Sequence, residues 1–188
     1  MEVKTLEEIR GECESCRRCP LSETRTNVVF GTGNPRADLM FVGEAPGESE
    51  DLSGVPFVGR AGKLFDQYLE AVGIERNDVY IANILKCRPP KNRDPLPDEE
   101  DLCIGYLRDQ VRAVSPKLIV CLGRIAAMRL IKPDFKITAE HGVFAERGPF
   151  RIAAVYHPSA LLRDPSKRGA MLADMLMIRD ELERIRKG

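Results

Sequence analysis

The sequence predicts an α/β fold, a three-layer α/β/α sandwich with a central, mainly parallel four-stranded sheet. Short apolar runs alternate with helix-like segments along the 188 residues, which is typical of parallel sheets. The runs are rich in β-branched residues, as expected for strands that are buried on both faces. Each of three runs also leads into a polar residue suited to chemistry: residues 37–42 precede Glu44, 79–82 precede Asn83, and 152–156 precede His157.

The remaining elements follow from spacing and composition. Leu6 and Ile9 lie at helical spacing and predict a first helix over 5–16, and an apolar stripe from Leu64 to Val72 predicts a second helix that ends at Gly73. Acidic residues at 98–101 suit the start of a third helix because they complement its dipole. Glycine and proline predict loops over 43–59 and 88–97. The expected strands are 38–42, 79–84, 118–122 and 152–156, with a hairpin or meander over 135–150 and further helices over 124–130 and 168–186.

Composition and charge are those of an ordinary globular protein. We find no internal repeat and no linker, so we expect residues 1–188 to form a single domain. No apolar run approaches the roughly 20 residues that cross a bilayer, and the N-terminus has no apolar signal region, so we expect a cytoplasmic protein without a membrane partner. The 29 basic and 29 acidic residues balance, so net charge favours no class of partner. Basic clusters at 86–93 and 163–168 are either phosphate contacts or solvated surface. We expect a monomer.

Six cysteines are many for a cytoplasmic chain, where disulfides are disfavoured, so some of them are expected to bind a metal. Four thiolates suit either tetrahedral zinc or a [4Fe-4S] cluster, and the spacing does not decide between the two. Cys121 lies within an apolar strand and is expected to be a small buried hydrophobe. Cys13 and Cys16 are one possible pair. The other possibility is a set of four that the proline-rich loop folds together: Cys16, Cys19, Cys87 and Cys103.

The three polar residues that follow strands are the candidate catalytic group. Ligands bind beyond the carboxyl ends of parallel strands, so Glu44, Asn83 and His157 would meet at one edge of the sheet. Each also has a simpler interpretation. Glu44 could pair with Arg60 or Lys63 at the surface, Asn83 could cap a turn, and His157 could be a hydrogen-bonded structural histidine.

Several longer stretches, taken together, resemble a family-4 uracil-DNA glycosylase, the iron–sulfur branch of that superfamily. They cover most of the chain in the family's order, so the match is specific although each motif alone is weak. They begin at Cys16 and continue with TNVVFG at 26–31, GEAPG at 43–47, PFVG at 56–59, NILKCRPP at 83–90 and HPSALLR at 157–163. The resemblance selects Cys16 and Cys19 as the first cysteine pair, leaves Cys13 as an extra, and implies [4Fe-4S] rather than zinc.

The resemblance implies an enzyme of DNA base-excision repair. Such a monofunctional glycosylase flips uracil out of single- or double-stranded DNA and hydrolyses its N-glycosidic bond, which leaves an abasic site. Glu44 would stabilise the cationic sugar and orient water, and His157 would hydrogen bond to the departing uracil as a neutral imidazole. Asn83 would pair with the O4 and N3–H edge of uracil, Phe57 would stack on the base, and Gly43 would belong to the substrate-binding residues. The simpler interpretation of Phe57 is a loop phenylalanine folded into the core.

Further roles are implied outside the base pocket. Leu161 or Leu162 would wedge into the vacated base stack, and Arg163 would bind a phosphate, although helix packing is an alternative for the leucines. Glu48 or Glu50 could exclude the methyl group of thymine. The cluster would do no redox chemistry and would fasten the N-terminal helix to the 87–103 loop.

Three rival interpretations remain. The first is a non-catalytic iron–sulfur module of the same fold that binds DNA or a replication partner. The second is a uracil-trapping relative that forms a covalent adduct through a loop histidine, a residue type absent from 87–97. The third is a zinc hydrolase, which usually requires histidine ligands and an open coordination position.

Overall fold

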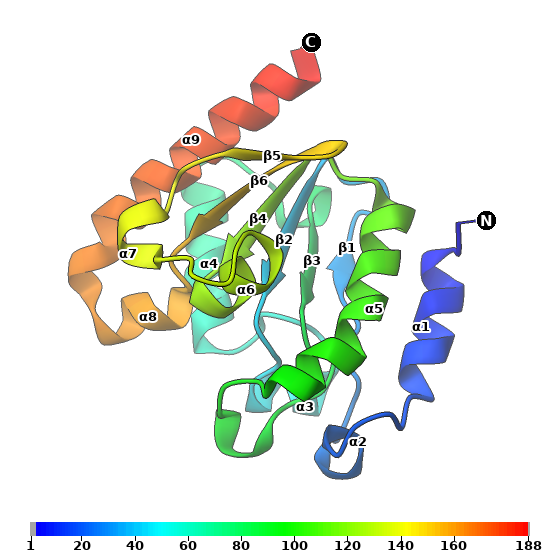
Figure 1. Ribbon diagram of the computed structural model, residues 1–188. Coiled ribbons are helices and arrows are strands. Elements are labelled where there is room, and N and C mark those ends of the chain that lie inside the picture. Colours follow the sequence, from blue (N-terminus) through cyan, green and yellow to red (C-terminus); the bar gives the residue numbers. More distant parts are fainter. Residues whose placement is uncertain (1–2, 188) are drawn as a thin grey trace.

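The structure, a computed structural model, describes residues 3–187 as alternating helices and strands around one sheet (Figure 1). Three single-turn 3-10 helices cover Arg76–Asp78, Pro90–Asn92 and Pro165–Lys167. The strands are β1 (Thr32–Gly33), β2 (Leu39–Gly43), β3 (Tyr80–Asn83), β4 (Leu118–Leu122), β5 (Ala145–Arg147) and β6 (Phe150–Val155). The α-helices are α1 (Leu6–Glu14), α2 (Leu21–Thr24), α3 (Glu48–Ser53), α4 (Arg60–Ala71), α5 (Pro97–Val114), α6 (Arg124–Leu130), α7 (Ile137–Glu140), α8 (Pro158–Arg163) and α9 (Arg168–Lys187).

The sheet confirms the predicted mainly parallel α/β architecture. Its strand order is β1-β3-β2-β4-β6-β5, in which β3, β2, β4 and β6 are parallel neighbours. These four correspond to the predicted strands. The sheet has six strands rather than four, because short β1 and β5 pair antiparallel with β3 and β6 at the two edges. β1 was not predicted, because a strand of only two residues has no recognisable sequence pattern.

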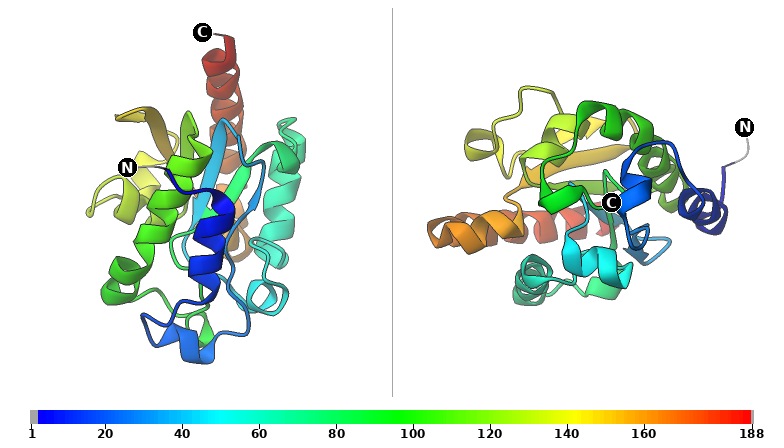
Figure 2. Two further views of the ribbon diagram at one scale, coloured as in Figure 1. Left: turned by 90° about the vertical axis from the view of Figure 1, so that its right-hand side faces the viewer. Right: turned by 90° about the horizontal axis from the view of Figure 1, so that it is seen from below.

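The central strands are buried on both faces, and successive side chains enter opposite hydrophobic cores. Leu39 and Phe41 of β2 pack with α4, α8 and α9, whereas Met40 and Val42 pack with α5 and α6. The view from below in Figure 2 shows these two helical layers on either side of the sheet, with α1 outside α5. This alternation explains why the strand sequences are apolar throughout. It leaves the sheet's carboxyl edge as the place for polar side chains.

Two segments differ from the predicted loop and hairpin. Residues 43–59 contain α3, whose flanking glycines serve as caps: Gly47 precedes it, and Gly54 follows it in the left-handed conformation with φ of 74°. Residues 135–150 contain α7 in their first half, where Glu140 accepts a hydrogen bond from the Lys136 N–H at 2.7 Å. The predicted hairpin is therefore limited to β5 and β6 around Gly148.

Candidate active site

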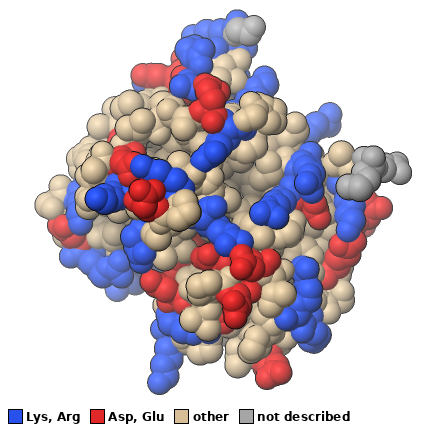
Figure 3. Space-filling view, viewed as in Figure 1, with Lys and Arg blue, Asp and Glu red and all other residues tan. Residues whose placement is uncertain are grey.

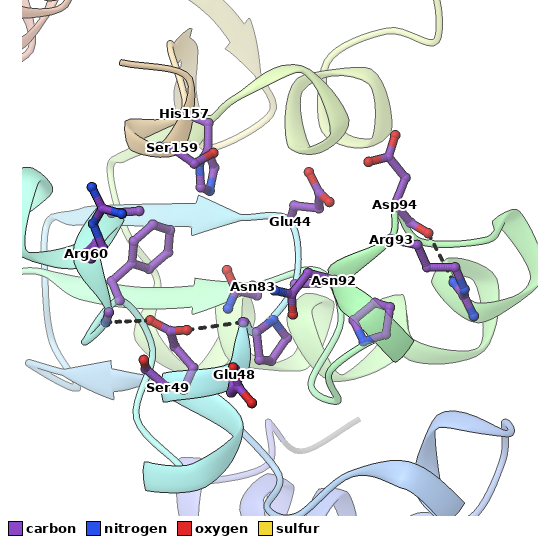
Figure 4. A pocket seen from close by; sticks show the side chains of 18 of the residues that line it. Glu44, Glu48, Ser49, Arg60, Asn83, Asn92, Arg93, Asp94, His157 and Ser159 are labelled. Atoms are coloured by element: carbon purple, nitrogen blue, oxygen red, sulfur yellow. Dashed lines mark hydrogen bonds between the residues drawn. The ribbon is translucent and has the colours of Figure 1, made fainter. Parts of the chain in front are cut away.

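A cavity of about 500 Å³ lies beyond the carboxyl ends of the parallel strands. Glu44 follows β2, Asn83 is the last residue of β3, and His157 follows β6; all three line this cavity. Figure 4 shows their side chains around the same space. The sequence pattern thus predicted which residues converge, because parallel strands deliver their C-terminal neighbours to a single edge.

The environment of Glu44 favours a protonated or catalytically poised carboxyl group over a surface ion pair. Within residues 3–187, Glu44 makes no salt bridge, so the alternative pairing with Arg60 or Lys63 is wrong. Burial, assisted by the negative charge of Asp94, raises the pKa of Glu44 to about 7. A carboxyl group with this pKa exchanges protons near neutral pH, as general acids and bases do.

His157 is held as a neutral imidazole with a defined tautomer. Its Nδ1 accepts a hydrogen bond from the backbone N–H of Ser159 at 3.1 Å and lies 2.7 Å from the Ser159 Oγ. Because a backbone N–H can only donate, Nδ1 carries no proton and the neutral ring carries it on Nε2. Burial, together with the positive charge of Arg163, lowers the pKa of His157 to about 4. The ring therefore offers one N–H donor and no positive charge at neutral pH.

Asn83 is buried, with 2% of its surface exposed. Among the described residues, its Oδ1 has no hydrogen-bond partner. A buried amide oxygen without a partner is costly, so a ligand that donates a hydrogen bond would relieve a real deficit. The main-chain carbonyl of Asn83, in contrast, accepts a hydrogen bond from the Lys86 Nζ at 2.7 Å.

Phe57 lines the cavity and is buried against the core, and Gly43 lies behind it without lining the cavity. Phe57 adopts φ of 54°, an unusual value for a bulky residue, and its ring centroid lies 5.7 Å from that of His157. A Cβ on Gly43 would approach the Asn83 Oδ1 to 2.3 Å and the Phe57 ring to 2.7 Å. A Cβ on Gly62 would lie 2.0 Å from the Phe57 carbonyl oxygen. Two glycines thus permit the close approach of the aromatic ring, the amide and the backbone.

Sequence reasoning did not identify how Glu50 acts. Its carboxylate accepts hydrogen bonds from the backbone N–H groups of Gly47, Val58 and Gly59 at 3.2, 3.0 and 2.8 Å. It therefore fastens the two ends of the 43–59 segment together. The other candidate for excluding thymine, Glu48, is mainly exposed and lies 3.8 Å from Arg88. The sequence signal for these hydrogen bonds is the spacing of Gly47 and Glu50, the N-cap and third residue of α3. The signal is weak because the glycines in this segment are equally typical of a loop.

Asn92 and Asp94 also line the cavity, although the sequence suggested only an irregular loop for them. Asn92 has a left-handed backbone conformation with φ of 54°, and its Oδ1 accepts a hydrogen bond from the Arg88 Nε at 2.8 Å. The loop thus contributes polar groups to the side of the cavity nearest Glu44.

The expected DNA-contacting residues divide into two groups. Leu161 is fully buried in the core with α4 and α9, so the expectation that it contacts DNA is wrong; the register of α8 turns it inward. Leu162 is half-buried, and Arg163 is exposed and lines the cavity. A DNA contact by Leu162 or Arg163 stays a prediction.

The cysteines gather around a second, much smaller cavity of about 20 Å³. Besides Cys13, its lining includes all four of the predicted ligands: Cys16, Cys19, Cys87 and Cys103. The Arg25 guanidinium donates to the Cys87 Sγ at 3.1 Å, and the Lys86 N–H donates to the Cys103 Sγ at 3.4 Å. Burial opposes ionisation of Cys16, but hydrogen bonds with Tyr106 and Arg18 lower its pKa overall. Such donors suit sulfurs that carry negative charge as metal ligands.

The remaining two thiols are core residues. Cys121 lies fully buried in β4, as expected. Cys13 is 1% exposed and packs with Ile9, Phe30 and Tyr106, and burial raises its pKa to about 12. In residues 3–187, no group of three or more histidine, cysteine, aspartate or glutamate side chains is arranged to hold a metal ion. Four thiols around one small cavity suit either a tetrahedral zinc ion or a [4Fe-4S] cluster.

No helix in the described part of the chain is both long and apolar enough to cross a membrane. Lysines, arginines and acidic residues are interspersed over the face shown in Figure 3.

Comparison with known proteins agrees with this fold and site. The sequence model of the uracil DNA glycosylase superfamily matches residues 30–179, so the class of protein is an α/β glycosylase-like protein of that superfamily. A type-4 uracil-DNA glycosylase of Archaeoglobus fulgidus is 46% identical over 94% of this chain and 92% of its own length. One from Thermotoga maritima is 43% identical over 86% of this chain and 85% of its length. The chain therefore belongs to the type-4 uracil-DNA glycosylases.

Proposed function

We propose that this protein removes uracil from DNA by hydrolysing the N-glycosidic bond, leaving free uracil and an abasic site. The main support, besides membership of this family, is the set of side chains that line the cavity. A carboxyl group, a neutral imidazole with a free Nε2–H, and an amide whose oxygen has no partner within residues 3–187 line one cavity. These are the groups that a uracil glycosylase needs, and none of them is occupied by a structural ion pair.

Breaking the bond develops positive charge on the sugar and negative charge on uracil. Glu44, once ionised, stabilises the cationic sugar and orients the attacking water, and it takes up the water's proton. His157 donates its Nε2–H to the uracil oxygen on which negative charge grows. A neutral donor is preferable here because the site does not bury a cation before the reaction.

Asn83, Phe57 and Gly43 recognise the flipped base. The free Oδ1 of Asn83 accepts the N3–H of uracil, while the amide N–H₂ group donates to O4. Cytosine offers the reverse pattern and would leave buried groups unpaired, which such sites reject strongly. Phe57 stacks on the base, and Gly43 lets the Asn83 and Phe57 side chains come together, because a Cβ there would lie 2.3 Å from the Asn83 Oδ1.

DNA is bound by local contacts beside the cavity. The 29 basic and 29 acidic residues balance, and both signs are mixed on the face that Figure 3 shows. Arg163 contacts a phosphate beside the cavity, and Leu162 contacts the stack that the flipped base leaves. The proposal includes single- and double-stranded substrates, a monomeric protein whose residues 1–188 form one domain, and a cytoplasmic location.

The cysteine site holds a structural [4Fe-4S] cluster through Cys16, Cys19, Cys87 and Cys103. Cys16 and Cys19 of the N-terminal segment, Cys87 after β3 and Cys103 on α5 would hold the cluster, which would fasten these three regions together and take no part in hydrolysis. The convergence of these four thiols on one small cavity and the N–H donors from Arg25 and Lys86 support this assignment.

The test uses purified protein and a labelled oligonucleotide with a single uracil, treated with hot alkali after incubation to break abasic sites. We expect cleavage at uracil only, with an otherwise identical thymine oligonucleotide left intact. A folded, iron-containing preparation that produces no alkali-sensitive site would overturn the proposed activity in favour of a non-catalytic DNA-binding module.

A further inference from the structure

Lys86 is a buried lysine that lies between the candidate active site and the cysteine site. It is only 1% exposed and is one of the largest fully buried side chains. The sequence suggested that it belongs to a basic cluster for phosphate or solvent, and its burial shows that interpretation to be wrong. A buried ammonium group is strongly destabilising unless it is hydrogen bonded, so its contacts deserve a functional explanation.

Both observed contacts of its ammonium group are short. The Nζ donates to the main-chain carbonyl of Asn83 at 2.7 Å and to the Gln110 Oε1 at 2.6 Å. Gln110, on α5, is itself fixed because its Nε2 donates to the Phe30 carbonyl at 2.8 Å and to the Tyr80 hydroxyl at 3.2 Å. Lys86 therefore anchors the end of β3 to α5 through a buried network.

The main chain around Lys86 extends this connection in two directions. Toward the cavity, Ile84 and Leu85 donate their N–H groups to the carbonyls of Gly43 and Glu44, both at 3.0 Å. Toward the cysteines, the Lys86 N–H donates to the Cys103 Sγ at 3.4 Å. Three residues after Asn83, one residue is thus bonded both to the Asn83 carbonyl and to a cysteine sulfur.

We propose that Lys86 is a positioning residue for uracil recognition. By bonding to the main-chain carbonyl of Asn83, it fixes the direction of the Asn83 side-chain amide and connects that residue to the cysteine site. This inference rests on the proposed function. The peptide that follows Asn83 is held on both sides, because its Ile84 N–H donates to the Gly43 carbonyl and its Asn83 carbonyl accepts from the Lys86 Nζ. The direction of the Asn83 amide determines which base edge it can pair with, and a small rotation of the peptide would misalign both of its hydrogen bonds.

The test replaces Lys86 with methionine, which fills a similar volume without the charge or the two hydrogen bonds. The matched control is Tyr80→Phe, which removes a hydroxyl from the same network on the side away from Asn83. Binding of free uracil and free cytosine is measured by calorimetry, and iron per chain and melting temperature are measured in parallel.

We expect Lys86→Met to weaken uracil binding about tenfold and to reduce the preference for uracil over cytosine. Tyr80→Phe should change neither, and both variants should keep their iron because the Lys86 N–H remains.

Several outcomes would overturn the inference. Equal uracil affinity in Lys86→Met and wild type, or equal losses in Lys86→Met and Tyr80→Phe, would show that Lys86 only stabilises the fold. Loss of iron together with uracil affinity would show general disruption of the cysteine site. If Lys86→Met does not fold, Lys86→Gln is measured instead, because its shorter, neutral side chain cannot donate to both the Asn83 carbonyl and the Gln110 Oε1. An affinity between those of wild type and Asn83→Ala supports the inference, and wild-type affinity contradicts it. If the wild-type protein itself neither binds nor excises uracil, the proposed function fails instead.

Discussion

At the scale of single residues, the environment of Glu44 makes a specific pH dependence part of the mechanism. Burial raises its pKa to about 7, and the proposed role requires the ionised form. We therefore expect kcat/KM to rise about tenfold per pH unit below pH 7 and to level off above it. His157, with a pKa of about 4, stays neutral throughout this range.

Glu44→Gln is the matched variant for that profile. It keeps the shape of the side chain and removes the titration, so its slow residual rate should not change with pH between 5 and 9. The profile is measured under single-turnover conditions at constant ionic strength. If the rate of Glu44→Gln still rises with pH below pH 7, the pH dependence comes from another titrating group.

Gly43 makes a second prediction at this scale. In Gly43→Ala, the new Cβ would lie 2.3 Å from the Asn83 Oδ1 and 2.7 Å from the Phe57 ring, so one of these side chains must move. Misplacement by about 1 Å can cost about 10²-fold in rate, and we expect a loss of this order in kcat/KM. Gly11→Ala is the control, because its Cβ would meet nothing within 4 Å. Equal activity of both variants with wild type would contradict the proposed packing of the base pocket.

At the scale of elements, α8 carries one side chain that packs in the core and another that is exposed at the cavity. Its register buries Leu161 in the core while Arg163 stays exposed beside the cavity. Arg163→Ala should weaken binding of every DNA sequence and lower the slope of log affinity against log salt by about one. Arg36→Ala, an exposed control before β2 at the other end of the sheet, should leave the slope unchanged. An unchanged slope in Arg163→Ala would remove this residue from the phosphate contact.

Helices and strands with local sequence signals were predictable, whereas features that depend on contacts between distant elements were not. β4 and the start of α9 agree with the expected ranges because apolar runs and helical periodicity are local signals. α3 was hidden because its capping residues, Gly47 and Gly54, are also typical of loops. The burial of Leu161 and Lys86 depends on contacts between distant elements, which no local pattern reports. Glu44, Asn83 and His157 were recognisable because strand topology alone brings them to the same edge.

At the scale of the whole molecule, the cysteine site connects the N-terminal segment to the body of the fold. α1 packs against α5 through Ile9, Cys13 and Tyr106. The four proposed ligands come from the segment after α1, the segment after β3, and α5. Cys87→Ala should therefore lose its brown colour and bound iron. Its melting temperature should fall by about 5 °C or more, since about 1 kcal/mol corresponds to about 2–4 °C in a chain of this size.

Cys121→Ala is the control for that experiment, because Cys121 lies in β4 and away from the cysteine cavity. It should keep its iron although it loses some packing. Metal analysis that finds zinc rather than iron in the wild-type protein would exclude the proposed cluster. A colourless Cys87→Ala protein with full stability and activity would contradict a structural role for it.

The central claim is that Glu44 and His157 perform the chemistry in the cavity at the carboxyl edge of the sheet. The most direct measurement compares single-turnover cleavage of a uracil oligonucleotide by wild type, Glu44→Ala and His157→Ala, with DNA affinity measured alongside. The account predicts that each substitution slows cleavage by about 10²–10³-fold, while affinity falls much less. Wild-type cleavage rates in both variants would show that the reaction takes place without these two residues.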